Sequence, residues 1–262
     1  MSDQVVTFTP AENAAIGTIT LNKPPANSYD IDFVHQLDAC IGAADKDASV
    51  RVVVLRSASA KFFSAGADIK AFMASTSAAN MAMIETAHAA LSKIAASNKI
   101  YIAAINGHAL GGGLEMALAC DLRFAGEGQY GLGLPEVTLG LLPGNGGTQR
   151  LSRLIGPNKA LELMLTGERV TPQQALALGI VNRIFASDTF EADVLAYATK
   201  LATGAHAAVG AIKRAVYDGI AQPLAGGLAL ERELIAPLFD TEDAREGMRA
   251  FAEKRTPVYK GK

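Results

Sequence analysis

The strongest constraint on how this chain folds is a pair of short apolar segments, residues 52–55 and 100–105, that contain no charged residue. Uninterrupted apolar runs of this length are typical of strands that are covered on both faces, as in parallel sheets. Residues 80–96 lie between the two segments and have a helical pattern, and parallel strands need a crossover of this kind. The alternation therefore predicts an α/β protein.

Weaker patterns place further elements on both sides of this unit. Runs at 5–8 and 16–21, rich in β-branched and aromatic residues, predict a hairpin whose turn falls at 10–13. From residue 188 onward the pattern is almost wholly helical, so a sheet-rich part is followed by a helical part. The other expected elements are a helix from Asp30 with Ile31, Val34, Leu37 and Ile41 on one face, a loop at 57–67, a turn at Asn106 and Gly107, a helix that Gly111, Gly112 and Gly113 open and that ends at Ala119, a strand at 122–125, and helices at 149–155, 159–165 and 172–178 that end at Gly156, Gly167 and Gly179.

Composition excludes several classes of protein. Half of the 262 residues are hydrophobic and 19% are charged, a balance that excludes disorder for most of the chain. The net charge of −2 argues against a nucleic-acid partner, and the longest charge-free run, residues 100–114, is shorter than the roughly 20 residues of a membrane span. The first residues show no signal or transit pattern, so a cytoplasmic location is expected. Cys40 and Cys120 are expected to be reduced core residues.

The common catalytic and cofactor motifs are missing from the sequence. Ser64 lacks the flanking glycines of a nucleophile elbow, and neither a zinc-binding HExxH helix nor a Walker loop occurs. The glycines at 111–113 lack the third glycine and the later acidic residue of a dinucleotide site, since residue 133 is glycine. A nicotinamide enzyme is therefore disfavoured. The four histidines are scattered and are interpreted as surface or packing residues: His35, His88, His108 and His206.

Charged residues are scarce between residues 100 and 149, and two of the few present are unusual. Glu115 and Glu136 have no basic residue within four positions. A carboxyl group in an apolar site without a nearby cation favours its protonated form, which a general acid requires. The alternative is that Glu115 only offsets a helix dipole and Glu136 only begins a turn. Because the helix around Glu115 is apolar on all sides, it offers this carboxyl no solvated face, and a functional role is favoured.

The glycines that open this helix have two possible roles. A helix N-terminus presents unpaired N–H groups, and glycine lets a substrate oxygen approach them closely. Together with an N–H from a second loop, such a terminus forms an oxyanion hole, and the loop at 64–68 follows a predicted strand at a suitable place. The alternative is that the glycines serve only helix packing.

Four segments in this order resemble the signature blocks of the enoyl-CoA hydratase/isomerase (crotonase) family, and so does the end of the chain. The segments are FSAGADIK at 63–70, AINGHALGGGLE at 104–115, LPEVTLG at 134–140, PGNGGTQRL at 143–151 and FAEKRTPVYKG at 251–261. The resemblance implies an α/β spiral of ββα repeats in residues 1–190 and a helical trimerisation region in residues 191–262. It also implies an acyl-CoA thioester substrate, no metal or redox cofactor, coenzyme A only as part of the substrate, and a homotrimer or hexamer. No membrane partner is expected, because no segment is long and apolar enough to span a bilayer.

The resemblance also assigns roles to individual residues. It implies that the peptide N–H groups of Ala67 and Gly112 hold the thioester oxygen, and that Glu115 and Glu136 are the catalytic acid and base. The other substrate-binding residues that it implies are Ala65, Asp68 and Ile69, which line the coenzyme A path, Gly111 and Pro135, and Phe251 and Lys254, which reach the adenosine, in some members from a neighbouring subunit.

Both glutamates are present, which favours hydration of a 2-enoyl-CoA to a 3-hydroxyacyl-CoA. The alternatives within the family are isomerisation, a specialised dehydration or hydrolysis, and ring chemistry, and a non-catalytic binding protein is a further one. Two positions depart from the family pattern. The stretch at 130–134 is about one residue longer than usual, and Tyr29 stands where a small apolar residue is common. Both departures bear on which acyl chain the site accepts.

Overall fold

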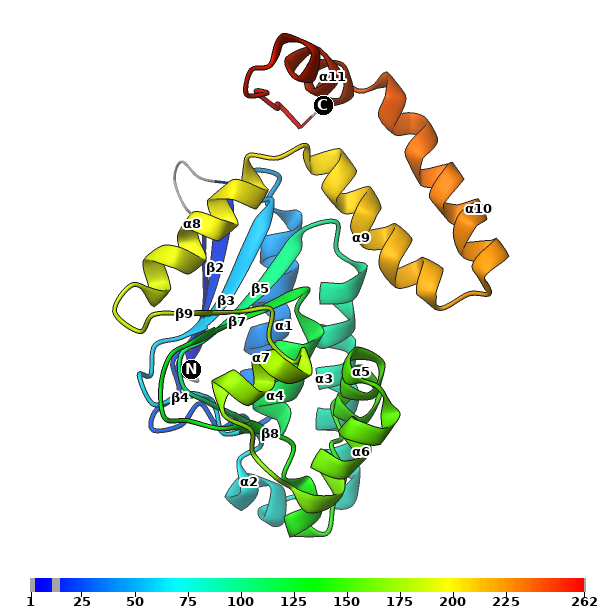
Figure 1. Cartoon of the computed structure of the whole chain (residues 1–262). Coiled ribbons are helices and arrows are strands. Elements are labelled where there is room, and N and C mark those ends of the chain that lie inside the picture. The colour runs from blue at the N-terminus through cyan, green and yellow to red at the C-terminus, as the bar shows by residue number, and fades with distance from the viewer. Residues whose placement is uncertain (1–2, 11–14, 262) are drawn as a thin grey trace.

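The computed structural model describes residues 3–10 and 15–261 and is built around a sheet of six strands (Figure 1). β1 and β2 pair antiparallel, which confirms the hairpin, and the later neighbours in this sheet pair parallel. The predicted turn lies outside the described residues except for Pro10, which is the last residue of β1. In spatial order the strands are β1 (Val6–Pro10), β2 (Ile16–Leu21), β3 (Val52–Ser57), β5 (Ile100–Ile105), β7 (Leu122–Gly126) and β9 (Arg183–Phe185).

A spiral of ββα turns adds a second, smaller sheet. The chain leaves β3, β5 and β7 in turn, adds one short strand each time to the second sheet, and then enters a helix. The predicted spiral is confirmed, but the loop expected at 57–67 is wrong in part because it contains a strand. Strands of two or three residues are too short to show an alternating pattern, and they form because a neighbouring strand completes their hydrogen bonds. The second sheet consists of β4 (Phe62–Ser64), β6 (His108–Leu110) and β8 (Leu132–Gly133).

Side chains at the helix ends explain several helix boundaries. Asp30 caps α1 by accepting a hydrogen bond from the Phe33 N–H at 3.0 Å, and Thr171 forms a capping box with Gln174 at the start of α7. Gly167 and Gly179 end two helices in the left-handed conformation. The helices are α1 (Ile31–Lys46), α2 (Ile69–Ala74), α3 (Ser77–Ala96), α4 (Gly112–Ala119), η1 (Glu136–Leu139), α5 (Gly147–Ile155), α6 (Pro157–Thr166), α7 (Pro172–Leu178), α8 (Phe190–Ala202), α9 (His206–Ile220), α10 (Leu224–Ile235), η2 (Ala236–Asp240) and α11 (Glu242–Glu253).

One expected core residue of α1 is not in the core. Val34, Leu37 and Ile41 are buried, but Ile31 is 37% exposed. Six residues before Leu37, Ile31 points about 120° away from the buried stripe at 100° per residue. The stripe instead continues through Phe33.

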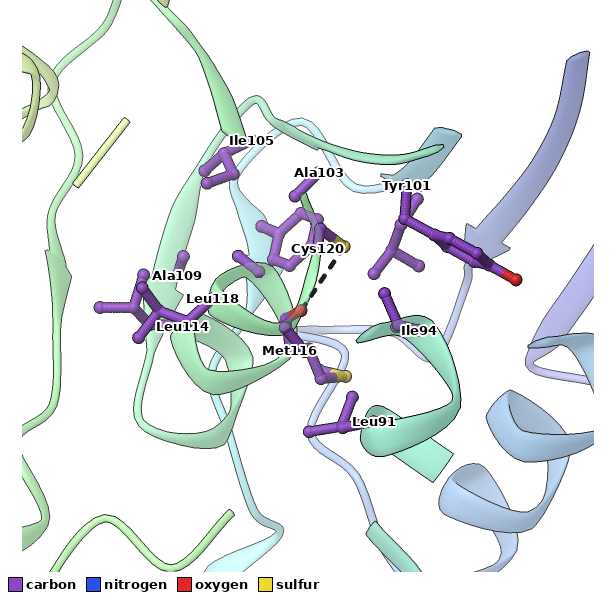
Figure 2. Close-up of a cluster of buried hydrophobic side chains, with 14 of the residues drawn as sticks. Leu91, Ile94, Tyr101, Ala103, Ile105, Ala109, Leu114, Met116, Leu118 and Cys120 are labelled. Carbon is purple, nitrogen blue, oxygen red and sulfur yellow. Dashed lines mark hydrogen bonds between the residues drawn. The ribbon is translucent and has the colours of Figure 1, made fainter. Parts of the chain in front are cut away.

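The core surrounds α4 on all sides. All eight residues of this helix are buried, and Figure 2 shows its Leu114, Met116 and Leu118 packed among side chains of β5 and α3. Cys120 follows the helix in the same cluster and is a free, buried thiol, as is Cys40. Because apolar side chains occupy the space around α4, a carboxyl group on it is kept from bulk water.

The C-terminal helices leave the sheet in steps. α8 packs on the sheet through Phe190, Val194 and Ala198, whereas α9 and α10 extend from it as an arm; α10 runs back along α9 and leads to α11, which lies above the junction of α8 and α9 (Figure 1). The division at residues 190 and 191 stays a prediction. In the described part of the chain, no helix combines the length and hydropathy that a bilayer crossing needs.

Candidate active site

The N-terminus of α4 lies against the loop that follows β4. A β-carbon added at Gly113 would overlap the Ser64 carbonyl, and one added at Gly66 would lie 3.3 Å from the Gly112 nitrogen. Gly111 has a φ of +54° and Gly66 a φ of +90°, conformations that L side chains rarely adopt. The glycines therefore serve packing and also bring two stretches of bare backbone together.

The two expected oxyanion donors face one cavity. The backbone of Tyr29 brackets Ala67, since Tyr29 N–H donates to the Gly66 carbonyl at 2.9 Å and Asp68 N–H donates to the Tyr29 carbonyl at 2.8 Å. Within the described residues, neither the Ala67 N–H nor the Gly112 N–H donates a hydrogen bond, and both residues line the cavity. Two fixed donors with no protein acceptor can bind a developing oxyanion.

The cavity has a volume of about 370 Å³. Beside the glutamates and the donors, its wall is largely apolar, with contributions from α2, α3 and the segment after η1. The lining residues are Tyr29, Ala65, Gly66, Ala67, Ile69, Phe72, Met81, Met83, Ile84, Gly111, Gly112, Glu115, Pro135, Glu136, Leu139, Leu141, Leu142, Gly144 and Asn145.

Glu115 is 1% exposed and projects from the first turn of α4. Its Oε1 accepts hydrogen bonds from the N–H groups of Asn145 and Gly147, both at 2.7 Å. Burial raises the pKa of Glu115 to about 7; the Gly147 N–H opposes the rise, and the negative charge of Glu136 adds to it. At neutral pH this carboxyl can therefore both accept and release a proton.

Glu136 begins η1 and points back toward α4. Its Oε1 lies 2.7 Å from the place of a β-carbon on Gly111, and its buried Oε2 has no hydrogen-bond partner in the described part of the chain. Burial raises the pKa of Glu136. The pKa values of both glutamates thus move in the direction that their charge-poor sequence setting indicated.

The structure brings together most of the predicted site residues but not all of them. Ala65, Ile69, Gly111 and Pro135 line the cavity with the catalytic candidates. The carboxylate of Asp68 instead caps α2, accepting from the N–H groups of Lys70 and Ala71. Phe251, which is 88% exposed, and Lys254 lie at the end of α11, at the opposite end of the molecule from α2 (Figure 1).

Sequence reasoning missed the support that the loop at 143–147 gives to Glu115. Asn145 and Gly147 lie within a segment that carried the family resemblance, but no pattern assigned them a contact. A β-carbon on Gly147 would lie 2.9 Å from Glu115 Oε1, which explains the glycine. The residues of the apolar wall come from α2, α3 and residues 139–142, and apart from Ile69 the sequence analysis did not assign them to the site.

The fold and the site define a class of protein: an α/β spiral that can bind an oxyanion on two backbone N–H groups beside one buried and one half-buried glutamate. The sequence model for "Enoyl-CoA hydratase/isomerase" matches residues 11–262. A probable enoyl-CoA hydratase of Bacillus subtilis is 39% identical over 94% of this chain and 95% of its own, and the 2,3-dehydroadipyl-CoA hydratase of Escherichia coli is 42% identical over 93% and 94%. The crystal structure of an enoyl-CoA hydratase from Geobacillus kaustophilus superposes with a TM-score of 0.95 at 44% identity, covering 100% of this chain and 98% of the other.

The chain therefore belongs to the enoyl-CoA hydratase/isomerase, or crotonase, family and has its fold. Membership implies a substrate of the acyl-CoA class.

Proposed function

We propose that this protein is a 2-enoyl-CoA hydratase, a hydro-lyase that adds water reversibly across the double bond of a 2-enoyl-CoA. The observation that carries the proposal is that one cavity is lined by the buried Glu115, by the half-buried Glu136, and by two residues, Ala67 and Gly112, whose N–H groups donate no hydrogen bond within the described residues. All three relatives given above are named as hydratases.

The proposed reaction uses each of these groups. The N–H groups of Ala67 and Gly112 bind the thioester oxygen and stabilise the enolate that forms as the water oxygen bonds to C3. One glutamate, as carboxylate, takes a proton from that water, and the other, as carboxylic acid, gives a proton to C2. Both atoms of the double bond are then saturated and the pair of carboxyls has exchanged roles. The two carboxyls titrate together, so the proton that they share belongs to the pair.

The cavity wall supports an uncharged acyl chain. Among the described lining residues, the only charged ones are the two glutamates, so an acyl chain that ends in a carboxylate would find no cation there. One relative is named for 2,3-dehydroadipyl-CoA, whose acyl chain ends in a carboxylate. We expect this protein to turn over 2-hexenoyl-CoA with at least about tenfold higher kcat/KM than 2,3-dehydroadipyl-CoA. The negative charge of the cavity glutamates would repel the carboxylate at the end of the second substrate. Equal values would contradict the proposed neutral pocket.

The reaction is tested by following loss of the conjugated enoyl thioester of crotonyl-CoA and longer homologues, together with the product. Glu115→Gln and Glu136→Gln should each lower kcat by about 100-fold or more, since a positioned acid or base contributes that much. A wild-type protein that leaves every 2-enoyl-CoA untouched would refute the hydratase proposal. Conversion to a 3-enoyl-CoA instead of a 3-hydroxyacyl-CoA would identify an isomerase.

We further propose that the protein works in the cytoplasm as a homotrimer or hexamer. Exposed apolar side chains on the arm support the oligomer, because a group of such side chains on one element is typical of a surface that packs against another protein chain. On α9 and α10, the large apolar side chains that are more than half exposed are Ile212, Val216, Ile220 and Leu224.

A further inference from the structure

We infer that Tyr29 is a positioning residue of the active site, whose hydroxyl joins the support of Glu115 to the oxyanion donor Gly112. The inference rests on the proposed hydratase function for its kinetic consequences. The sequence indicates only that Tyr29 is larger than the residue usual at this position. The structure adds the groups that its hydroxyl contacts.

The backbone of Tyr29 holds one side of the oxyanion hole. Its N–H and carbonyl bond to the residues on either side of Ala67, so the extended segment at Tyr29 fixes the plane of that peptide. Any movement of Tyr29 is therefore transmitted to the Ala67 N–H.

The side chain of Tyr29 reaches the other two parts of the site. Its hydroxyl oxygen accepts a hydrogen bond from Asn145 Nδ2, and the N–H of the same Asn145 donates to Glu115 Oε1 at 2.7 Å. The hydroxyl also fills the space that a β-carbon on Gly112 would occupy. One phenol thus contacts the residue that supports the carboxyl and the residue that supplies the second donor.

The surroundings of the phenol suit a fixed, neutral group. Tyr29 is 5% exposed, and its ring packs at 6.2 Å from that of Phe33. Burial raises the pKa of Tyr29 above its ordinary range, and the charges of Glu115 and Glu136 raise it further, so the hydroxyl keeps its proton. The titratable groups that face it are these two glutamates, while Asn145 is its uncharged hydrogen-bond partner.

Loss of the hydroxyl has a specific consequence. In Tyr29→Phe, the Asn145 amide loses its acceptor, while Asn145 Oδ1 is already a buried atom without a partner among the described residues. A side-chain amide that has no partner for its Nδ2 or its Oδ1 reorients. The backbone N–H of Asn145 then forms a weaker hydrogen bond with Glu115. Because that N–H bond lowers the pKa of Glu115, its loss moves this pKa upward.

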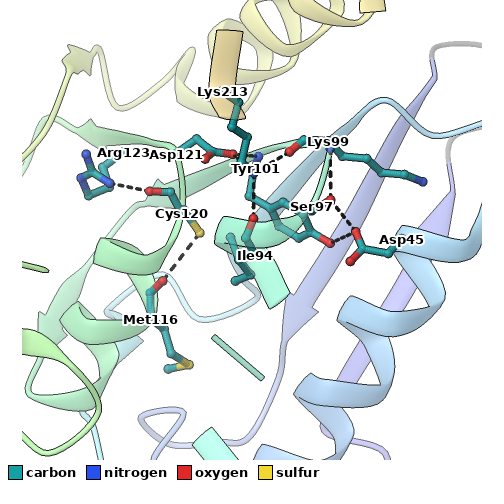
Figure 3. Close-up of polar contacts among 10 residues, drawn as sticks. All are labelled: Asp45, Ile94, Ser97, Lys99, Tyr101, Met116, Cys120, Asp121, Arg123 and Lys213. Atoms are coloured by element: carbon teal, nitrogen blue, oxygen red, sulfur yellow. Dashed lines mark hydrogen bonds and ion pairs between the residues drawn. The ribbon is translucent and has the colours of Figure 1, made fainter. Parts of the chain in front are cut away.

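The experiment compares Tyr29→Phe with Tyr101→Phe. Tyr101 is also buried but does not line the cavity, and its hydroxyl donates to Asp45 at 2.8 Å (Figure 3). Tyr29→Phe should lower kcat about tenfold with little change in KM, and Asn145→Ala should add no further loss to it. A carbon-13 titration of the Glu115 carboxyl should show its midpoint raised by about half a pH unit or more in Tyr29→Phe only.

The outcomes separate the inference from the proposed function. An unchanged Glu115 titration in Tyr29→Phe, or an equal shift in Tyr101→Phe, would overturn the positioning role whatever the reaction is. Additive losses in the Tyr29→Phe and Asn145→Ala pair would also overturn it. A wild-type protein without hydratase activity whose Glu115 midpoint still responds to Tyr29→Phe would refute the function and leave the inference standing.

Discussion

At the scale of single residues, Glu115 is the residue whose place in the site lowers the stability of the fold. A solvated glutamate is ionised well below neutral pH, but this one is buried among the apolar side chains of α4 and beside a second carboxyl. Two N–H groups stabilise the ionised form without cancelling the effect of burial. Because the proposed reaction needs a proton acceptor at neutral pH, the site keeps Glu115 in a place where burial destabilises its ionised form.

Replacing this carboxyl should make the protein more stable at high pH. The folded-state pKa of Glu115 is about 7 against 4.5 for the unfolded chain, so the folded state binds more protons between these values. The protonated form of Glu115 contributes its full stability below pH 4.5, and this contribution is lost as pH rises through 7. The total loss is at most about 3 kcal/mol of unfolding free energy. Glu115→Gln keeps the acceptor oxygen for both N–H groups and has no such loss.

Urea unfolding at pH 5 and pH 8 checks this prediction. The free energy of unfolding of Glu115→Gln, measured relative to wild type, should be higher at pH 8 than at pH 5. Glu162→Gln, on the exposed surface of α6, is the control for losing one negative charge. The same pH trend in both variants would show that the effect belongs to net charge.

The chemistry of these residues was only partly predictable from the sequence. The lack of local cations around Glu115 and Glu136 is visible in the chain itself, and it indicated carboxyls with disfavoured charge. The contact between Tyr29 and Asn145 joins residues 116 positions apart. No periodicity carries such a contact, because it depends on how the spiral places the two loops around α4.

At the scale of elements, glycine decides where backbones touch. Gly113 lies where α4 meets the Ser64 carbonyl, while Gly42 lies within α1 with nothing within 4 Å of an added β-carbon. The first position needs glycine for space, and the second only loses helix propensity by having it.

Alanine at these two glycines should have opposite effects. Gly113→Ala should destabilise the fold by about 3 kcal/mol or more, because a backbone carbonyl cannot move aside cheaply. Gly42→Ala should stabilise it by about 0.5–1 kcal/mol. Both values follow from urea unfolding. A Gly113→Ala protein as stable as wild type would show that the contact between α4 and the loop is looser than the structure has it.

The arm is attached to the core by a buried ion pair. Lys213 of α9 directs its three protons to Asp121 at 2.9 Å and to the carbonyls of Ile94 and Lys99 at 2.7 and 2.8 Å (Figure 3). Burial raises the pKa of Asp121, and the Lys213 charge opposes that rise. The Lys213 ammonium thus compensates the negative charge of Asp121, which would otherwise be buried without a counter-ion.

Breaking this pair should release α9. Lys213→Met leaves Asp121 buried without its cation, which costs about 3–5 kcal/mol, whereas the neighbouring Arg214→Met removes an exposed pair with Asp218 and costs at most about 1 kcal/mol. Hydrogen exchange should show faster exchange across α9 in the first variant alone. Similar free energies of unfolding for the two variants would contradict an anchoring role for Lys213.

At the scale of the whole molecule, the sequence predicted the parts better than their arrangement. Apolar runs identified the long strands, and glycines identified the ends of α6 and α7. The resemblance supplied the spiral, which periodicity could not, because the second sheet consists of strands of two or three residues. Nothing in the local pattern indicates that α9 and α10 extend from the core, since an exposed apolar face and a buried one have the same periodicity.

The position of α11 leads to a prediction about neighbouring subunits. Phe251 and Lys254 are expected to contact the adenosine of coenzyme A, yet they lie at the end of α11, at the opposite end of the molecule from α2, which lines the cavity (Figure 1). If both statements hold, these residues serve the site of another subunit. Lys254→Ala should then raise KM for the acyl-CoA about tenfold with kcat unchanged, as expected when a contact equally strong in ground and transition states is lost.

Mixed oligomers test the direction of this contact. Chains with Lys254→Ala keep Glu115, and chains with Glu115→Gln keep Lys254, so a mixture forms sites in which each supplies what the other lacks. A fraction of sites with wild-type KM should appear on mixing if α11 reaches across subunits. A KM that stays at the Lys254→Ala value would place the contact within one chain. Light scattering should give a mass of three or six 27.3 kDa chains for Lys254→Ala and for Glu115→Gln, because neither substitution lies on the apolar face of the arm. A monomer would rule out any contribution across subunits.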